Sequence, residues 1–330
     1  GHLFPAIAVA KSFEKSQSHF LIDKRTEKIL LGKDFKYHVI SSSKLEKNIF
    51  TIIISIFKIF YGFVYSFCLI IKFKPSLVVG FGGYTSIPTI LAAKVLNKKI
   101  LIHEQNSVMG KTNRFLSKIS TKIAITYKNT MFANESAIFS GIPIRKLKIK
   151  KQKKKKNKKV ILIIGGSQGA QVFSEIIKKV LLRFDKNLLQ KIFIVHQVRK
   201  EDLKSMENFY QNLNIKFKIK SFFTNIYDEI NNSDLIISRC GASTLAEIEF
   251  FKKFCILIPL PTSANNHQFY NAVEFKRTNN CEIINQSNIN NDKLVKIIKF
   301  NLFEKKIKKI QQQRKTKKLS LVNIINDMLK

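Results

Sequence analysis

The chain of 330 residues contains no tryptophan, only 6 prolines, and far fewer acidic than basic residues. Asp and Glu number 22 against 59 Lys and Arg, which gives a formal net charge of +37. Such an excess favours binding to nucleic acid, an anionic membrane leaflet or phosphorylated small molecules, and it carries no information about the fold. Part of it has a mutational explanation, because abundant Lys, Ile, Asn and Phe without Trp are typical of an AT-rich coding sequence. The charge therefore narrows only the class of partner.

Cysteine is scarce, and its 4 occurrences are widely spaced without a C-x-x-C pair. This spacing indicates neither a zinc site nor a redox dithiol, and it favours a reducing compartment. A hydrophobic content of 45% excludes a disordered chain, and the length suggests two domains. The sequence begins at Gly1-His2 without Met, a basic leader or a cleavage-site pattern, so we expect it to be a fragment that lacks its natural beginning.

Short apolar runs alternate with helix-length segments through most of the chain. Helices are expected at Pro88–Asn97 and Gln171–Phe184, where the apolar residues recur at helical spacing. Alternation of strand and helix indicates βαβ units, and therefore parallel sheet with helices on both faces. The expected strands are Leu77–Val79, Ile100–Ile102, Ile123–Thr126, Val160–Ile164, Ile192–Val195, Leu235–Ile237 and Cys255–Ile258.

Two runs of basic residues interrupt this pattern. Residues 146–159 contain 10 Lys and no acidic residue, so this block repels itself and is expected to be the linker between domains 1–145 and 160–330. Residues 305–318 contain eight Lys or Arg and lead into a final amphipathic helix. Neither run is interleaved with aromatic residues, and no nucleic-acid reader motif is present, so nucleic acid is not expected as a partner. Two interpretations stay open for both runs: a solvated face of the protein, and a segment that contacts an anionic membrane surface.

The segment Ile49–Ile71 is long and apolar enough for a membrane span, with Lys58 as its only charge. Its few polar or small residues, however, recur every three or four positions and draw one narrow stripe along a helix. Three interpretations stay open: a helix packed only on the sheet, a helix that also presents apolar side chains to the membrane interface, and a true span. Lys72 and Lys74 suit both a helix C-terminus and anionic headgroups.

Three glycine-bearing turns follow expected strands, and each can expose helix N-terminal amides to a phosphate. They are Gly80-Phe81-Gly82-Gly83-Tyr84, Gly165-Gly166-Ser167-Gln168-Gly169-Ala170 and Gly241-Ala242-Ser243-Thr244-Leu245-Ala246-Glu247. In the third turn Ser243 and Thr244 can cap the helix, and Glu247 can accept hydrogen bonds from ribose hydroxyls. No Lys-Ser or Lys-Thr pair follows these turns, which excludes a P-loop triphosphatase.

Further polar groups follow other expected strands. His103-Glu104-Gln105-Asn106 comes after Ile100–Ile102, and an amide-rich loop, Pro259–Gln268, comes after Cys255–Ile258. No pair of carboxylates or Asp-x-Asp lies at a strand end, so a metal-dependent transfer is not expected. Leaving-group charge would then fall to helix N-termini and to Arg145.

Seven short motifs occur in the order and spacing of the MurG family, the N-acetylglucosaminyltransferases of peptidoglycan synthesis, over residues 1 to about 280. They are Gly1-His2-Leu3-Phe4-Pro5-Ala6, Gly82-Gly83-Tyr84, His103-Glu104-Gln105-Asn106, Gly141–Arg145, Gly165–Ala170, Ser238-Arg239-Cys240-Gly241-Ala242 and His267-Gln268 through Asn271-Ala272. The chain therefore resembles this family. The family begins with a strand and a Gly-Gly-Thr-Gly-Gly-His loop, of which this sequence has only Gly1-His2, so the sequence as given could be inactive. The resemblance therefore implies that the natural protein carries roughly 10 to 20 more residues, enough for one strand and one loop.

The resemblance implies an α/β chain with the GT-B glycosyltransferase fold, in which two Rossmann-like domains with parallel sheets face a central cleft. The final helix would return to the N-terminal domain. The implied reaction is the inverting, metal-independent transfer of GlcNAc from UDP-GlcNAc to the muramoyl 4-hydroxyl of lipid I, which gives lipid II. No cofactor or metal is implied. The implied partners are UDP-GlcNAc, lipid I and an anionic membrane surface, at the cytoplasmic face of the bacterial inner membrane.

Site residues follow by the same resemblance. His2 matches the family's proposed general base. Uracil and ribose contacts would fall on Ile226 (through its backbone), Leu245 and Glu247, and diphosphate contacts on Ser167 and the turn Ala242–Thr244, near Arg145. The sugar would meet Gln268 and Asn271, and Asn106 would reach the donor across the cleft. Gly1 and Ala246 complete the expected donor-binding residues.

Two other functions stay open beside this one. A related GT-B enzyme that glycosylates diacylglycerol would also use a UDP-sugar and bind membranes peripherally. A degenerate relative without turnover, which binds polyanions or membranes, is also compatible with the net charge. The Gln268 loop and the His103–Asn106 motif favour the lipid I transferase.

Overall fold

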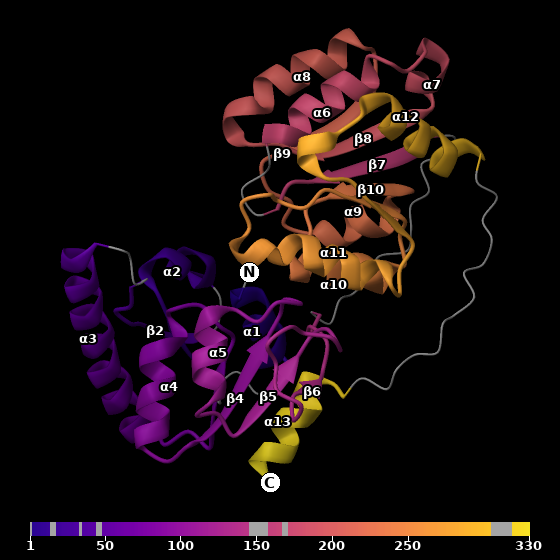
Figure 1. Cartoon of the computed structure of the whole chain (residues 1–330). Helices are drawn as coiled ribbons and strands as arrows, with labels where there is room; N and C mark the ends of the chain where they lie inside the picture. The colour runs from indigo at the N-terminus through magenta and orange to yellow at the C-terminus, as the bar shows by residue number, and fades with distance from the viewer. Residues whose placement is uncertain are drawn as a thin grey trace. The chain divides into compact units, whose positions relative to one another are not determined.

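The computed structural model describes residues 2–13, 18–32, 35–43, 48–144, 158–166, 171–304 and 319–330, and of Ile49 the backbone only. Its chain divides into two compact units (Figure 1). The N-terminal unit comprises residues 1–146 and 315–330, and the C-terminal unit comprises residues 147–314. The two basic runs fall almost entirely outside the described residues.

The N-terminal unit contains two parallel sheets. A small sheet pairs β1 (His19–Ile22) with β2 (Lys36–Val39), and a larger sheet has the strand order β3-β4-β5-β6. The larger sheet consists of β3 (Leu77–Gly80), β4 (Lys99–Glu104), β5 (Lys122–Ile125) and β6 (Ile138–Phe139). The first three of these strands lie where the sequence pattern predicts them. The strands β1 and β2 were not predicted, because each includes a histidine and neither is a continuous apolar run.

Helices cover both faces of this larger sheet. Leu101 and Ala124 point to the face covered by α1 (Leu3–Ala10) and α13 (Leu321–Leu329). Ile100 and Ile102 point to the opposite face, against α3 (Ile49–Phe73), α4 (Ser86–Val95) and α5 (Lys111–Ser117). This alternation is the two-residue period of a strand buried on both sides. The helix α2 (Lys24–Leu30) packs beside β2.

The last helix, α13, belongs to the N-terminal unit although it is at the C-terminus of the chain. Its apolar side chains Leu321, Ile324, Ile325 and Met328 are buried with Val9 of α1 and Leu101 of β4. The Lys99 ammonium group donates a hydrogen bond to the Met328 carbonyl oxygen at 2.7 Å. An amphipathic helix buries its apolar face where a complementary face is open, and here α13 completes the cover of the sheet.

The predicted helix at residues 49–71 is confirmed as α3, and its orientation is the reverse of that of an ordinary amphipathic helix. Ser55, Gly62 and Ser66, the small or weakly polar stripe, are buried against the domain. Ser66 Oγ lies 3.2 Å from Thr89 Oγ1 of α4, and Ser55 Oγ donates to Ser43 Oγ at 3.0 Å. The wide apolar face is exposed instead, with large side chains at Phe50, Ile53, Ile54, Ile56, Phe57, Phe60, Tyr61, Val64, Tyr65 and Ile71.

Among the described residues, α3 is also the one helix long and apolar enough to cross a membrane by length and composition. Only 22% of its most apolar window is buried. A core helix of a soluble domain would bury most of that window. The interpretation in which α3 packs only on the sheet therefore fails to account for its exposed face.

The C-terminal unit is built on a six-stranded parallel sheet with the order β12-β11-β10-β7-β8-β9. The strands are β7 (Lys159–Ile164), β8 (Ile192–Gln197), β9 (Lys216–Lys220), β10 (Leu235–Ser238), β11 (Cys255–Leu257) and β12 (Cys281–Ile283). Counted within the unit, this is the strand order of a doubly wound Rossmann fold. The strands β9 and β12 were not predicted, because β9 alternates Lys with apolar residues and β12 has Glu282 at its centre.

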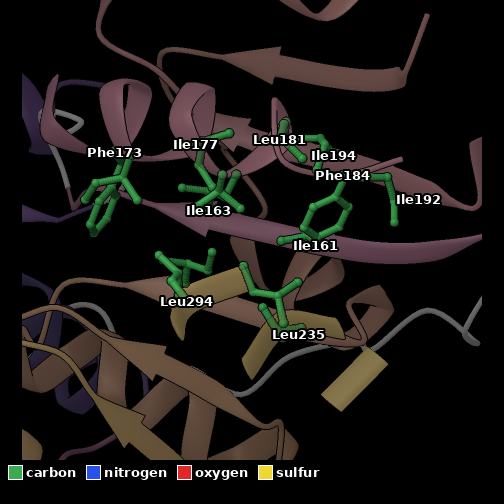
Figure 2. Packing of buried hydrophobic residues seen from close by; sticks show 14 of the residues in the cluster. Ile161, Ile163, Phe173, Ile177, Leu181, Phe184, Ile192, Ile194, Leu235 and Leu294 are labelled. Atoms are coloured by element: carbon green, nitrogen blue, oxygen red, sulfur yellow. The ribbon is translucent and has the colours of Figure 1, made fainter. Parts of the chain in front are cut away.

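Side chains of β7 alternate between the two faces of this sheet. Ile161 and Ile163 pack against α6 (Gln171–Leu181) and α12 (Asn291–Lys299), as Figure 2 shows for the cluster around Phe173 and Leu294. Val160, Leu162 and Ile164 belong to the other cluster, with α9 (Ile226–Asn232), α10 (Ala242–Phe251) and α11 (His267–Lys276). Burial on both faces explains why the strand reads as a continuous apolar run. The helices α7 (Lys186–Gln190) and α8 (Leu203–Asn212) complete the layer on the first face.

Candidate active site

The strand order of the C-terminal unit reverses between β7 and β10, and ligands of open parallel sheets bind at the carboxyl ends of strands at such a point. Two of the three glycine-bearing turns lie there, one after each strand. Gly165 and Gly166 follow β7, and Gly166 has a φ of 89°, a backbone conformation that favours glycine. Arg239, Cys240 and Gly241 follow β10. The topology therefore brings both turns to one edge of the sheet.

The helix α10 begins at this edge, with Gly241 as its N-cap and no side chain capping it. The hydrogen bond that Leu245 N donates to the Gly241 carbonyl closes its first turn. The amides of Ala242, Ser243 and Thr244 precede this bond, so they lack an acceptor within the helix. Three such amides and the positive end of the helix dipole form a site suited to a phosphate group.

The expected donor-binding residues of α10 differ in burial. Ser243, Thr244 and Glu247 are partly exposed, whereas Ala242, Leu245 and Ala246 are buried. Leu245 is fully buried in the cluster of the second face, which also includes Ile226 at the start of α9. The side chain of Leu245 thus forms part of the core, and its backbone amide is already bonded to Gly241 within the helix.

Gln268, in the first turn of α11, holds two loops of this edge together. Its side-chain oxygen accepts hydrogen bonds from the backbone amides of Cys240 at 3.2 Å and Leu260 at 3.0 Å. One loop leads into α10 and the other follows β11. With the oxygen engaged in the scaffold, the NH₂ group is the part of this amide that remains to bind a sugar hydroxyl.

Asn271, one turn further along α11, has a different position from the one the family resemblance implies. It is fully buried, and its side-chain amide donates to the Cys240 carbonyl oxygen at 3.1 Å. A side chain so enclosed is not open to the sugar. Its contact with Cys240 instead supports the same turn that Gln268 holds from the other side.

Arg239 is a charged residue at this edge of the sheet, and it was not predicted as a site residue from the sequence. It is buried, and its guanidinium donates to three neutral oxygens: Ile258 O at 3.1 Å, Pro259 O at 3.0 Å and Gln286 Oε1 at 2.7 Å. Burial lowers the pKa of Arg239, but a guanidinium stays charged in proteins. A fixed positive charge therefore lies at the residue between β10 and the α10 turn. An arginine directly after an apolar strand was the signal in the sequence.

In the N-terminal unit His2 lies at the start of α1, beside the turn that follows β3. A Cβ atom on Gly82 would lie 3.4 Å from Cε1 of His2, and one on Gly83 would lie 3.4 Å from its Cδ2. Both glycines have φ values, 93° and 77°, that favour glycine. The turn Gly82-Gly83 therefore allows the imidazole of His2 to lie directly against the backbone.

A hydrogen-bonded chain links His2 to the motif at the end of β4. His2 Nδ1 lies 2.6 Å from Oε1 of Gln105, and Nε2 of Gln105 lies 3.1 Å from Nδ1 of His103 and 2.9 Å from the His103 carbonyl oxygen. His103 Nε2 lies 3.0 Å from the Gly141 carbonyl oxygen. Burial lowers the pKa of His103 to about 4, so this imidazole is neutral near pH 7.

His2 itself keeps an exposed surface, although desolvation of its imidazole lowers its pKa below the ordinary histidine value. The hydrogen bond with Gln105 opposes this shift, as do the Glu104 carboxylate and the Phe81 carbonyl oxygen to a smaller extent. Near pH 7 His2 is therefore a neutral imidazole, the form that can accept a proton.

Glu104 and Asn106 of the same motif organise the loop after β4. The buried carboxylate of Glu104 accepts from Asn106 N at 2.9 Å, Asn106 Nδ2 at 3.2 Å, Gly110 N at 3.1 Å and Asn113 Nδ2 at 2.8 Å. The Asn106 side chain is partly exposed at the carboxyl end of the sheet. The Glu104 carboxylate thus holds the loop together by accepting hydrogen bonds from several of its residues, which explains why consecutive polar residues occur there.

Three expected site residues, Gly1, Arg145 and Ser167, lie outside the described residues. Among the residues that the structure does describe, no group of three or more His, Cys, Asp or Glu is arranged to hold a metal ion.

Comparisons with known proteins cover both units. Residues 1–125 match the glycosyltransferase family 28 N-terminal domain, and residues 160–328 match the glycosyltransferase family 28 C-terminal domain. A UDP-N-acetylglucosamine--N-acetylmuramyl-(pentapeptide) pyrophosphoryl-undecaprenol N-acetylglucosamine transferase from Rickettsia bellii (strain RML369-C) is 37% identical over 320 residues, covering 90% of this chain and 86% of the relative. The enzyme of the same name from Wolbachia sp. subsp. Brugia malayi (strain TRS) is 33% identical over 301 residues, covering 90% and 86%.

Solved structures give the same result. The crystal structure of Acinetobacter baumannii MurG matches with a TM-score of 0.73 and 26% identity, covering 92% of this chain and 87% of that one. The calicheamicin glycosyltransferase CalG4 matches with a TM-score of 0.65 at 9% identity over 92% and 88%, which shows the fold alone. The resemblance drawn from seven short motifs and the expected fold class are both confirmed. Because relatives above 30% identity cover nine tenths of its length and both domain families match, the chain belongs to the MurG family of glycosyltransferase family 28 and has the GT-B fold.

Proposed function

We propose that this chain transfers GlcNAc from UDP-GlcNAc to the muramoyl 4-hydroxyl of lipid I, with inversion at the anomeric carbon, to form lipid II. The names of the relatives identify the donor sugar and the undecaprenol-linked acceptor. The observation that supports the chemistry in this chain is the pairing of His2 with Gln105, which sets a neutral imidazole at the carboxyl end of the first sheet.

The donor would bind at the switch point of the C-terminal unit. Its diphosphate would accept hydrogen bonds from the amides at the start of α10, at Ala242, Ser243 and Thr244, close to the positive charge of Arg239. Glu247, one turn further along α10, would accept hydrogen bonds from the ribose hydroxyls. Developing negative charge on the departing UDP oxygen is stabilised by amides and a helix dipole that are already oriented. Gln268 would direct its NH₂ group to the sugar.

The acceptor would react at the N-terminal unit. His2 would take the proton of the 4-hydroxyl as its oxygen attacks the anomeric carbon and the bond to UDP breaks. The imidazolium that forms would be stabilised by Gln105 Oε1 and by Glu104, which both favour the protonated form. Asn106, beside Glu104, would contact the donor.

The test supplies UDP-GlcNAc together with either a soluble lipid I analogue or diacylglycerol vesicles. We expect GlcNAc transfer to the lipid I analogue and loss of that transfer in His2→Ala, with UDP affinity retained because the donor site lies in the other unit. Transfer only to diacylglycerol would instead assign the related lipid glycosyltransferase. UDP hydrolysis without transfer, or binding without turnover, would assign a degenerate relative. Each of these outcomes would overturn the proposal.

The second part of the proposal concerns location: α3 docks on the anionic cytoplasmic face of a membrane, which makes the protein peripheral. The exposed face of α3 includes Phe57 at 68% exposure and Phe60 at 61%. Exposed apolar stripes of this length mark interaction surfaces. Lys58 and Lys72 are exposed on the same helix and carry the charge that anionic headgroups attract.

Cosedimentation with anionic vesicles tests this location. We expect vesicle binding to fall steeply with salt, because salt screens the attraction between exposed lysines and anionic headgroups. UDP binding should depend less on salt, because it would rest on short hydrogen bonds from backbone amides. Replacement of Phe57 and Phe60 by Ser should weaken vesicle binding. Phe222→Ser is the matched control, since Phe222 is 53% exposed in the other unit. Equal binding of the α3 variant and the control would contradict docking by α3.

A further inference from the structure

In the hydrogen-bonded chain from Gly141 to His2, the positions of the protons are determined by oxygen atoms that can only accept hydrogen bonds. The carbonyl oxygen of Gly141 has no proton, so His103 Nε2, 3.0 Å away, must be the protonated nitrogen of its ring. Because His103 is fully buried and neutral near pH 7, its Nδ1 carries no proton and acts as an acceptor. The tautomer of His103 is thus set by a backbone atom 38 residues further along the chain.

The side chain of Gln105 has only one orientation that satisfies these acceptors. One hydrogen of its NH₂ group is donated to His103 Nδ1 at 3.1 Å and the other to the His103 carbonyl oxygen at 2.9 Å. A reversed amide would place its oxygen against that carbonyl oxygen, which is repulsive. The NH₂ group therefore faces His103, and Oε1 faces His2.

Oε1 of Gln105 can only accept a hydrogen bond, so His2 Nδ1, 2.6 Å away, must donate one. A neutral imidazole carries a single proton. The Phe81 carbonyl oxygen also favours a protonated ring, but less strongly than Gln105 does, so the proton lies on Nδ1 and the lone pair is on Nε2. We propose that Gln105 is a positioning residue for the transfer reaction. With His103 and the Gly141 carbonyl, it holds His2 in the Nδ1–H tautomer, so that Nε2 is the atom that takes the proton of the muramoyl 4-hydroxyl. This inference rests on the proposed role of His2 as general base.

The arrangement also explains the composition of the motif after β4. A glutamine at position 105 provides a donor pair and an acceptor on one rigid amide, and neither Glu nor Leu provides both. Gln105 is 3% exposed, so a lost partner would not be replaced easily by water. Among the described residues, the titratable groups that face His2 are Glu104 and His103 of β4.

The tautomer can be measured without activity. Selective ¹⁵N labelling of histidine and a long-range ¹H–¹⁵N correlation spectrum separate a protonated from a bare ring nitrogen. His2 is identified as the signal that disappears in His2→Gln. We expect a protonated Nδ1 and a bare Nε2 in the wild-type protein at neutral pH, and a mixture of tautomers in Gln105→Leu. A wild-type spectrum with the proton on Nε2 would overturn the proposal.

Kinetics separate this inference from the role of His2 itself. We expect Gln105→Leu to lower kcat by about 10²-fold, as a misoriented base does, while KM for UDP-GlcNAc stays unchanged. In Gln105→Glu the carboxylate still accepts from Nδ1, so activity should partly return, and the acidic limb of the pH profile should move to higher pH because a negative charge favours imidazolium. Gln197→Leu is the matched control, since Gln197 is also buried, at 5% exposure, but belongs to the other unit.

The outcomes are distinguishable. If His2→Ala keeps full activity, the base role in the proposed function fails. If His2→Ala is inactive while Gln105→Leu keeps the wild-type kcat and pH profile, only the positioning role of Gln105 fails. Should Gln105→Leu not fold, the pH profile of Gln105→Glu and the wild-type spectrum still decide between these results.

Discussion

Gly62 of α3 lies directly against the carbonyl oxygen of Ser41, in a space where a Cβ atom would overlap that oxygen. The same Cβ atom would lie 3.3 Å from Cβ of Pro88 in α4. This contact shows how α3 packs: its small residues form the inner face and allow the backbones to approach closely, and its large apolar residues are left outside.

Gly62→Ala should therefore destabilise the protein by about 1–3 kcal/mol, since the added methyl group overpacks a backbone contact. The sign is informative, because the same change in an open helix interior stabilises by roughly 0.5–1 kcal/mol. Cys68→Ala, on the exposed face of the same helix, is the control and should be nearly neutral. Urea unfolding followed by circular dichroism measures both. A stabilised Gly62→Ala variant would contradict the packing described for α3.

Gln268 is expected to have a scaffold role and a binding role that two substitutions separate. Gln268→Leu leaves the amides of Cys240 and Leu260 without their acceptor and should cost about 1–3 kcal/mol of stability. Gln268→Glu keeps an acceptor oxygen but loses the NH₂ group, so stability should largely return. Calorimetry should then show weaker binding of UDP-GlcNAc to Gln268→Glu, with binding of UDP little changed. Equal loss for both ligands would argue against a sugar contact.

Arg239→Lys should fail to replace arginine at the end of β10. A single ammonium group cannot reach Ile258 O, Pro259 O and Gln286 Oε1 in the geometry of the guanidinium fork. We expect a stability loss of about 1–3 kcal/mol and UDP binding weakened about tenfold, which corresponds to about 1.4 kcal/mol. Lys253→Arg, elsewhere in the same unit, should leave UDP affinity unchanged. Unaltered UDP binding in Arg239→Lys would show that the buried charge does not act on the donor.

Glu247→Ala should abolish most of the UDP affinity if its carboxylate accepts the ribose hydroxyls. Glu249→Ala is a closely matched control, because it removes the same group two residues further along α10, on a different side of the helix. Binding of UDP to both variants, measured by calorimetry, checks the assignment. Undiminished affinity in Glu247→Ala would refute the ribose role.

Acid should destabilise the C-terminal unit through His196. Burial lowers the pKa of this fully buried histidine to about 3, from an ordinary value of 6.5. Between these two pH values the unfolded chain binds a proton that the folded chain does not, so stability falls as the pH decreases from about 6.5 toward 3. The slope from one such histidine is at most about 1.4 kcal/mol per pH unit.

Urea unfolding at several pH values tests this linkage with His196→Phe. The variant loses the hydrogen bond between His196 Nδ1 and Tyr210 Oη, 2.9 Å long, and should be less stable at pH 7. Its stability should then decrease less on acidification than that of the wild type. An identical pH slope in the two proteins would remove His196 as the cause.

Much of the site could be predicted from the sequence because its motifs are local. The turn before α10 is a run of consecutive residues, and a strand followed by glycine and a helix indicates an anion site wherever it occurs. His2 and Gln268 were selected by family resemblance, and the structure places both at carboxyl ends of sheets. The sequence could not show that Leu245 and Asn271 are buried, because a motif records order and not the direction of a side chain. Arg239 was not selected for a related reason: its partners follow in sequence by 19 to 47 residues.

The sequence by itself determined the alternation of strand and helix, the division into two domains of parallel sheet, and the apolar length of α3. These follow from periodicity and composition, which depend on neighbouring residues along the chain. Only the tertiary structure decided the strand order that creates the switch point, the inward direction of the small stripe of α3, and the contact between residues 2 and 105. Each of these depends on hydrogen bonds and packing between distant segments, and no local pattern encodes which distant partner a surface will meet.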